Sequence, residues 1–186
     1  MNKISDDILC RVEKPIRYTG GELNSFSKDK NKVDIRVAFC FPDVYEVGMS
    51  HLGTKILYYT MNQREDTFCE RAFAPWPDME EQMRKNNIPM YTLETKDSLK
   101  VFDLVAFTLQ YEMSYTNILN MLSMANIPIR AEDRTEDDPI VFCGGPCAYN
   151  PEPLYAVADF FALGEGEVQL EDRKSTRLNS SHNSNL

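Results

Sequence analysis

Three short segments rich in glycine and proline carry the residue types best suited to binding a ligand. They lie at 41–53, where Pro42, Gly48 and Gly53 fall, at 143–146, and at 164–167. Each follows a short apolar run that is typical of a buried strand. Glycine lets a ligand approach the backbone closely, and open parallel sheets bind ligands at the carboxyl ends of their strands. The pattern therefore predicts a ligand-binding edge.

The candidate site residues lie in these three segments and in the loop that follows 103–109. Gln110 could hydrogen-bond a polar ligand, although exposed polar loop residues are common. By itself a plain turn is the better explanation of Gly48 and Gly53, and it explains Gly144-Gly145 equally well. Three such segments at one edge of one sheet favour a shared site. We expect this site to consist of Pro42, Gly48, Gly53, Gln110, Tyr111, Gly144, Gly145, Pro146, Gly164 and Glu165.

Catalytic and metal-binding patterns have little support in the sequence. The two histidines are His51 and His182, and His182 lies in the basic, adapter-like tail at 173–186, so a Ser/His/Asp arrangement has little support. Cys143 and Cys147 are spaced C-x-x-x-C, but Asn150 stands where a third cluster-binding thiolate would be needed. We predict no catalytic residue and no metal ligand, and we interpret Cys40 and Cys143 as small buried hydrophobes.

Apolar runs and helical spacings alternate along the chain and must position these loops. We expect strands at 33–41, 68–74, 90–93, 103–109, 139–143 and 160–163. Helices are expected at 50–64 with Ser50 as cap, after Trp76-Pro77, and at 114–125. The alternation predicts an α/β, Rossmann-like fold, with a mostly parallel open sheet and helices on both faces.

Composition limits the partners. The formal net charge of −9 disfavours nucleic acid and anionic membranes, whose binding depends on Lys and Arg. No apolar run reaches the roughly 20 residues that span a bilayer, and the amino terminus does not have the pattern of a signal peptide. An odd number of cysteines, five, without framework spacing indicates reduced thiols and a cytoplasmic protein.

We expect three regions along the chain. Residues 1–31 form a polar amino-terminal arm, residues 32–172 form the Rossmann-like domain, and residues 173–186 form a disordered tail. This tail is basic and rich in Ser and Asn in an otherwise acidic protein, and it resembles a translated adapter sequence. A mobile native tail is the alternative.

Several motifs, taken in order, resemble one known family. They are Pro42 with Gly48-Met49 and Leu52-Gly53, the segment 109–119, Gly144-Gly145-Pro146 with Asn150-Pro151-Glu152-Pro153, and Asp159 with 164–167. Over about residues 10–172 the chain resembles the N-terminal domain of radical S-adenosylmethionine (SAM) proteins with a cobalamin-binding-like module, in an uncharacterised branch.

The resemblance implies cobalamin as the cofactor of this domain. It further implies that this chain is an N-terminal fragment, and that its partner is a radical SAM barrel of the same full-length protein. That barrel would cleave SAM at a [4Fe-4S] cluster and act on an unknown substrate. This chain lacks the C-x-x-x-C-x-x-C motif, so we expect no SAM cleavage by it alone.

Two alternatives to a cobalamin-binding domain stay open. Some cobalamin proteins ligate cobalt through Asp-x-His-x-x-Gly, but around His51 this chain has Met49 and Thr54 in place of the aspartate and glycine. We therefore interpret His51 as a helix-start residue. A non-catalytic scaffold that has lost its cofactor is one alternative, favoured if Met49, Tyr111 and Tyr149 fill the site. The other is a flavodoxin-like flavin or nucleotide module, although Gly-x-Gly-x-x-Gly and the Walker lysine loop are absent.

Overall fold

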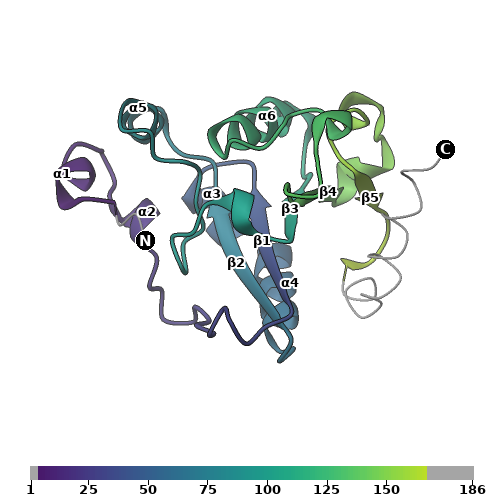
Figure 1. Cartoon of the computed structure of the whole chain (residues 1–186), viewed down its shortest axis with the longest axis horizontal. Helices are drawn as coiled ribbons and strands as arrows, with labels where there is room; N and C mark the ends of the chain where they lie inside the picture. The colour runs from purple at the N-terminus through teal and green to yellow at the C-terminus, as the bar shows by residue number, and fades with distance from the viewer. Residues whose placement is uncertain (1–3, 167–186) are drawn as a thin grey trace.

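The computed structural model, which describes residues 4–166, contains an open sheet of five strands with helices on both faces (Figure 1). The strands are β1 (Ile35–Phe41), β2 (Thr67–Phe73), β3 (Leu104–Thr108), β4 (Ile140–Gly144) and β5 (Phe160–Ala162). Their order is β2-β1-β3-β4-β5, and every neighbouring pair is parallel. The predicted α/β, Rossmann-like fold is confirmed, with a wholly parallel sheet that does not close into a barrel.

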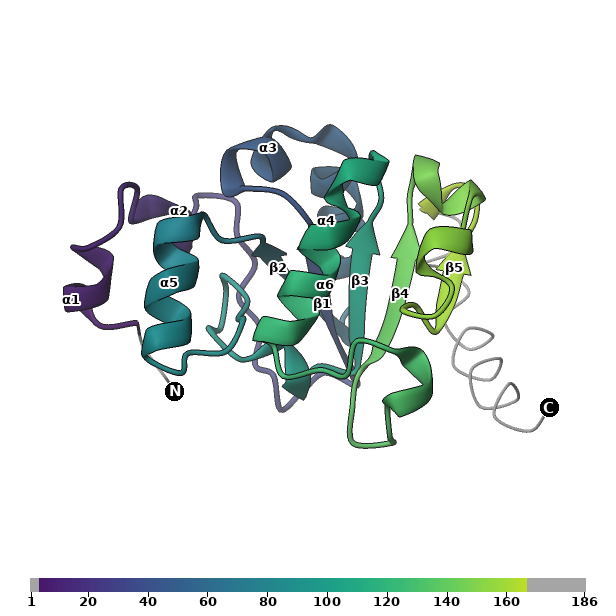
Figure 2. The same ribbon diagram turned by 90° about the horizontal axis from the view of Figure 1, so that it is seen from above.

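The longer helices divide between the two faces of the sheet. Helix α4 (Leu52–Asn62) covers one face, whereas α5 (Pro77–Lys85) and α6 (Tyr115–Met124) cover the other (Figures 1 and 2). Shorter helices are α1 (Asp6–Leu9), α2 (Ile16–Thr19) and α3 (Tyr45–Ser50). Single 3₁₀ turns lie at Leu99–Val101, Glu112–Ser114, Ala131–Asp133, Pro146–Tyr149 and Glu152–Leu154. None of the helices in the described part of the chain could cross a membrane.

Alternation along the strands separates two apolar cores. On the α6 side, Val105 of β3 and Val141 of β4 are fully buried against Ile118 and Leu122. On the α4 side, Val37 and Phe39 of β1 pack with a smaller cluster from α4 and β2. Successive side chains of a strand point to opposite faces, so each strand contributes to both cores.

The amino-terminal segment packs against the domain beside α5 (Figures 1 and 2). Ile8, Val12 and Tyr18 belong to the main core, and the Tyr18 hydroxyl accepts a hydrogen bond from the backbone N–H of Trp76 at 3.1 Å. Burial of these three side chains stabilises the attachment through the apolar area removed from water.

The expected helix at 50–64 is wrong in its start. Residue His51 is extended, with φ −79° and ψ 114°, and it separates α3 from α4. The cap of α4 is His51, whose Nδ1 accepts a hydrogen bond from the backbone N–H of Thr54 at 3.1 Å. Ser50 instead donates its hydroxyl to the carbonyl of Glu46. The interpretation of His51 as a helix-start residue is confirmed.

The strand expected at 90–93 is also wrong, because this segment pairs with the sheet only locally. Tyr91 forms an isolated antiparallel bridge with Ser98, and the N–H of Leu93 donates to the carbonyl of Arg71 at 2.7 Å. Between them the chain turns at Lys96, whose φ is +61°. The segment 91–98 therefore forms a loop along the outer edge of β2.

Candidate functional site

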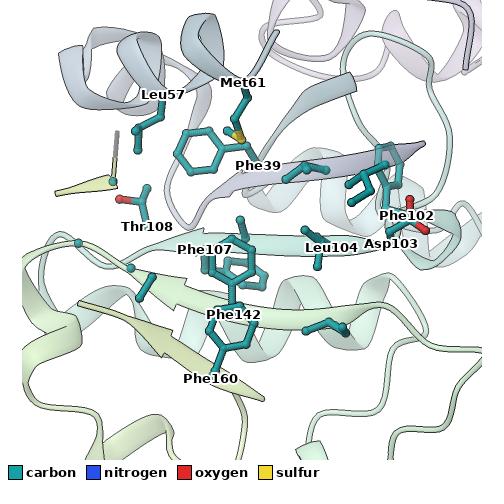
Figure 3. A pocket seen from close by; sticks show the side chains of 18 of the residues that line it. Phe39, Leu57, Met61, Phe102, Asp103, Leu104, Phe107, Thr108, Phe142 and Phe160 are labelled. Atoms are coloured by element: carbon teal, nitrogen blue, oxygen red, sulfur yellow. The ribbon is translucent and has the colours of Figure 1, made fainter. Parts of the chain in front are cut away.

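One large cavity lies along the α4-side face of the sheet, and we call it the sheet-face cavity (Figure 3). Its volume is about 740 Å³, within the roughly 300–1,000 Å³ of typical small-molecule sites. It runs from the carboxyl ends of β3, β4 and β5 to their amino ends, beside Leu57 and Met61 of α4. The cavity is therefore a long groove. We call its end at the carboxyl ends of the strands the carboxyl mouth, and its end at their amino ends the amino mouth.

The carboxyl mouth gathers residues from loops that are far apart in the sequence. Six of the ten predicted site residues line the cavity here, namely Gly53, Gln110, Gly144, Gly145, Pro146 and Gly164. They come from the start of α4 and from the loops after β3, β4 and β5. In this strand order, chain connections diverge between β1 and β3, the point where open parallel sheets place their ligands.

The other four predicted residues lie outside the cavity lining. Pro42 is buried and its carbonyl accepts a hydrogen bond from Asn117 Nδ2 at 2.9 Å. The Tyr111 hydroxyl donates to Asp43 at 2.7 Å, and this hydrogen bond raises the pKa of Tyr111. Glu165 is exposed. The loops after β3, β4 and β5 thus meet at the carboxyl mouth, whereas Pro42, Tyr111 and Glu165 lie outside the cavity lining.

Gly48, the fourth of these residues, is explained by packing alone. A Cβ built on it would lie 2.3 Å from Cε1 of Phe73 and 3.1 Å from Cγ of Phe41. Both rings are buried and cannot retreat cheaply. The short helix α3 can therefore approach β1 and β2 only where this side chain is missing.

The two adjacent glycines after β4 have different physical causes. Gly145 has φ +100°, and a Cβ there would lie 2.8 Å from the carbonyl oxygen of Leu109. A Cβ on Gly144 would meet only Ala162, at 3.6 Å from its carbonyl oxygen and 3.7 Å from its Cβ, which are ordinary contacts. The fold thus requires a glycine at 145, whereas the space beside Gly144 faces the cavity and is left open by its described neighbours.

Polar groups at the carboxyl mouth include Thr108, which the sequence patterns did not single out, and His51, which they indicated only as a helix-start residue. Gln110 Nε2 donates to Thr108 Oγ1 at 2.6 Å, which holds the amide at the mouth. The His51 imidazole lines the cavity while its Nδ1 caps α4, and it contacts Phe41 with ring centroids 5.5 Å apart. Thr108 is the last residue of a buried strand and lies two positions before Gln110, so its place at the carboxyl edge could have been predicted from the sequence.

The floor of the cavity is apolar and aromatic. Phe142 of β4 and Phe160 of β5 stack with ring centroids 4.8 Å apart and an interplanar angle of 4°. Phe39 from β1 and Leu104 from β3 continue the floor (Figure 3). Ala106 of β3 also lines the cavity. Apolar walls with a few polar groups at one end suit a ligand or segment that is largely apolar.

The amino mouth carries charges of both signs. Lys100 Nζ lies 3.2 Å from Asp138 Oδ1, and the Asp103 carboxylate accepts a hydrogen bond from the backbone N–H of Arg36. The N–H of Thr135 donates to Asp138 at 3.1 Å, and this hydrogen bond lowers the pKa of the carboxyl. Glu136 and Asp137 add further negative charge to the lining, which also contains Arg64, paired with Asp66 at 3.2 Å.

The cysteines lie away from the cavity. Cys143 is fully buried in the core on the α6 side, and burial raises the pKa of its thiol to about 12. Burial also raises the pKa of Cys147, which packs against that same core. Within residues 4–166 no group of three His, Cys, Asp or Glu side chains could hold a metal ion. Cys40 and Cys143 are buried apolar residues, as predicted.

Fold and cavity together define a class: an open parallel α/β domain with a ligand-sized cavity that opens at the carboxyl edge of its sheet. The comparison with known families goes further. Residues 53–184 match the family described as radical SAM proteins, N-terminal. This chain belongs to that family, as its motifs predicted.

The chain is also similar to one curated protein of unstated function. An uncharacterised protein of Methanocaldococcus jannaschii is 27% identical over 139 residues, which cover 73% of this chain and 24% of the relative. The chain thus spans about a quarter of the length of the curated relative it matches. No solved structure matches the chain.

Proposed function

We propose that this domain binds a corrinoid, cobalamin or a close analogue, at the carboxyl mouth of the sheet-face cavity. The observation that carries the proposal is the convergence of Gly53, Gln110 and the Gly144-Gly145-Pro146 loop on one opening. Residues separated by more than ninety positions in the chain meet there because parallel strands end at one edge. A flat macrocycle needs such a side-chain-poor surface.

The residues present fit this cofactor. The open space beside Gly144 would admit the edge of a flat ring, and Gln110 and Thr108 offer hydrogen bonds to amide arms. The apolar floor behind them would take the less polar side arm. When bound, a corrinoid supplies a cobalt centre suited to methyl transfer. The Nδ1 atom of His51 is engaged in capping α4, so this proposal does not use it as a cobalt ligand.

Catalysis in this proposal belongs to another part of the protein. The full protein would cleave SAM at a [4Fe-4S] cluster in a barrel outside this chain, and its substrate would be handled there. Large apolar side chains surround the carboxyl edge, with Met113 85% and Tyr149 71% exposed. Exposed apolar patches mark interaction surfaces, so we propose that the barrel packs against the carboxyl edge of the sheet. The domain at 32–172 belongs to the same proposal; its last residues, 167–172, and the expected tail at 173–186 lie outside the described residues.

The geometry weighs against a scaffold with a filled site. Met49, Tyr111 and Tyr149 do not line the cavity, so their bulk leaves its mouth clear. A flavin module remains the second candidate, because the order β2-β1-β3-β4-β5 is also that of flavodoxin-like proteins.

Spectral titration distinguishes these functions. Purified chain is titrated with hydroxocobalamin and, separately, with FMN, and the full-length protein is titrated alongside. We expect saturable cobalamin uptake and no FMN uptake. Saturable FMN uptake with no cobalamin uptake supports the flavin module, and absence of cobalamin uptake by both proteins overturns the proposal.

Gly144→Ala is the matched site variant. Its new methyl meets only ordinary contacts, so the fold is retained, whereas a methyl in the ring's path weakens cobalamin binding about tenfold or more, since overpacking costs roughly 1–3 kcal/mol. Tyr155→Phe, at an exposed position outside the cavity, should bind like the unaltered chain.

A further inference from the structure

The imidazole of His51 is held in one orientation at the carboxyl mouth. Its Nδ1 accepts a hydrogen bond from the backbone N–H of Thr54 at 3.1 Å and lies 2.9 Å from the Thr54 hydroxyl oxygen. Thr54 is buried, and the buried ring of Phe41 contacts the imidazole with ring centroids 5.5 Å apart. Two polar contacts on one nitrogen and an aromatic contact together fix the plane of the ring.

These contacts also fix which ring nitrogen carries the proton. A backbone N–H can only donate, so the Nδ1 atom that accepts from Thr54 must be unprotonated. The Thr54 hydroxyl, which approaches the same nitrogen, must then act as a donor too. In a neutral imidazole with an unprotonated Nδ1, the proton is on Nε2. His51 therefore presents Nε2 as an N–H donor.

The Nε2 donor is open to a ligand in the sheet-face cavity, which His51 lines. Within the part of the chain that the structure describes, Nε2 donates to no protein group and is not one of the buried polar atoms that lack a partner. Thr108 and Gln110 line the same mouth, joined by their hydrogen bond of 2.6 Å. The carboxyl mouth thus combines uncharged hydrogen-bonding groups from two distant segments.

The glycine at position 53 is explained by this ring. Gly53 does not have a positive φ, so its backbone conformation does not require glycine, and alanine is the better helix former. A Cβ on Gly53 would lie 3.0 Å from Cε1 and 3.5 Å from Nδ1 of His51. Because hydrogen bonds fix the ring, an added methyl would displace the imidazole and its Nε2–H. Gly53 therefore keeps the donor in position.

We propose that His51 is a specificity-determining residue, whose Nε2–H donates a hydrogen bond to a carbonyl oxygen of the ligand at the carboxyl mouth. This inference rests on the proposed function, in which the carbonyl belongs to an amide arm of the corrinoid. A neutral acceptor is favoured over an anion, because the cations of the described lining, Arg64 and Lys100, lie at the amino mouth. Ligation of cobalt by Nε2 would instead move the proton to Nδ1 and break the cap of α4.

Two amide substitutions separate the capping role of His51 from its contact with the ligand. His51→Asn keeps an acceptor suited to capping but has no donor at the position of Nε2, whereas His51→Gln reaches that position with an amide N–H and is a poor cap. Titration with hydroxocobalamin measures binding, and urea unfolding measures stability. We expect His51→Asn to unfold at the same urea midpoint as the unaltered chain and to bind about two- to tenfold more weakly, as for one lost hydrogen bond. His51→Gln should unfold at a lower midpoint and bind more tightly than His51→Asn.

Two further measurements complete the test. In ¹⁵N NMR of the chain without cobalamin, the histidine signals that disappear in His51→Asn belong to His51, and we expect them to show a proton on Nε2 alone. Gly53→Ala should weaken cobalamin binding, and adding it to His51→Asn should weaken binding no further, since both act through one donor. A proton on Nδ1, or equal binding by His51→Asn and the unaltered chain, overturns this inference and leaves the proposed function standing. Absence of uptake by the unaltered chain and by the full-length protein overturns both.

Discussion

The buried carboxylate of Glu70 gives a sharp test of how the edge of the sheet is held. Glu70 is 0% exposed on β2, and its Oε1 accepts a hydrogen bond from Arg36 at 2.6 Å. Its Oε2 accepts hydrogen bonds from the hydroxyls of Thr92 and Thr95, each at 2.6 Å, and from the N–H of Thr95 at 3.0 Å. One side chain thus ties the 91–98 loop to the sheet.

Glu70→Ala removes every one of these acceptors. Arg36 keeps its ion pair with Asp97 at 2.8 Å, but the buried Thr92 hydroxyl loses its acceptor. Breaking a buried pair from one side costs about 3–5 kcal/mol, a large share of the roughly 5–15 kcal/mol that stabilises a domain. Glu70→Gln keeps one acceptor oxygen but replaces the other with an NH2 group that faces donors, so we expect a smaller loss of about 1–3 kcal/mol.

Urea unfolding followed by circular dichroism measures both losses. Glu81→Ala, at an exposed position of α5, is the control and should change the free energy of unfolding by less than about 0.5 kcal/mol. If Glu70→Ala costs under about 1 kcal/mol at an unchanged m-value, the carboxylate does not hold the loop and the reasoning is refuted.

Three further predictions follow from packing and charge. Gly48→Ala should lower the free energy of unfolding by about 1–3 kcal/mol, because its methyl meets the Phe73 ring; a melting curve equal to the unaltered chain's would contradict this. A thiol reagent under native conditions should modify Cys10 fast and Cys147 partly, and should reach the buried thiols only after denaturation; mass spectrometry counts the adducts on Cys40, Cys69 and Cys143. The hydrogen bond from Arg17 lowers the pKa of Glu46 from 4.5 to about 2. The stabilisation that the Glu46 carboxylate gives to the amino-terminal arm is therefore complete above pH 4.5 and is lost as the pH falls toward 2. Limited proteolysis of residues 1–20 across that pH range should show this loss, and Glu46→Gln should remove the pH dependence.

Local patterns in the sequence were sufficient to predict the architecture. The apolar runs at 103–109 and 139–143 became β3 and β4 because a strand buried on both faces needs apolar residues at nearly every position. Proline at the first turn located α5, since Pro77 lacks an N–H that the helix start does not use. The glycines after β4 and β5 indicated the carboxyl mouth, because parallel strands end at one edge of a sheet.

Tertiary packing decided the rest. Gly48 and Gly144 look alike in the sequence, yet one accommodates the Phe73 ring and the other borders open space, because the difference is made by side chains distant in the chain. The 91–98 segment is a loop because Glu70 binds its threonines, a contact that no periodicity encodes. The five strands, their parallel arrangement and the glycine-lined edge could be read from the sequence, which also suggested a strand at 90–93 that does not form. Only the folded structure shows which glycine borders the cavity, because that depends on neighbours a few ångströms away in space.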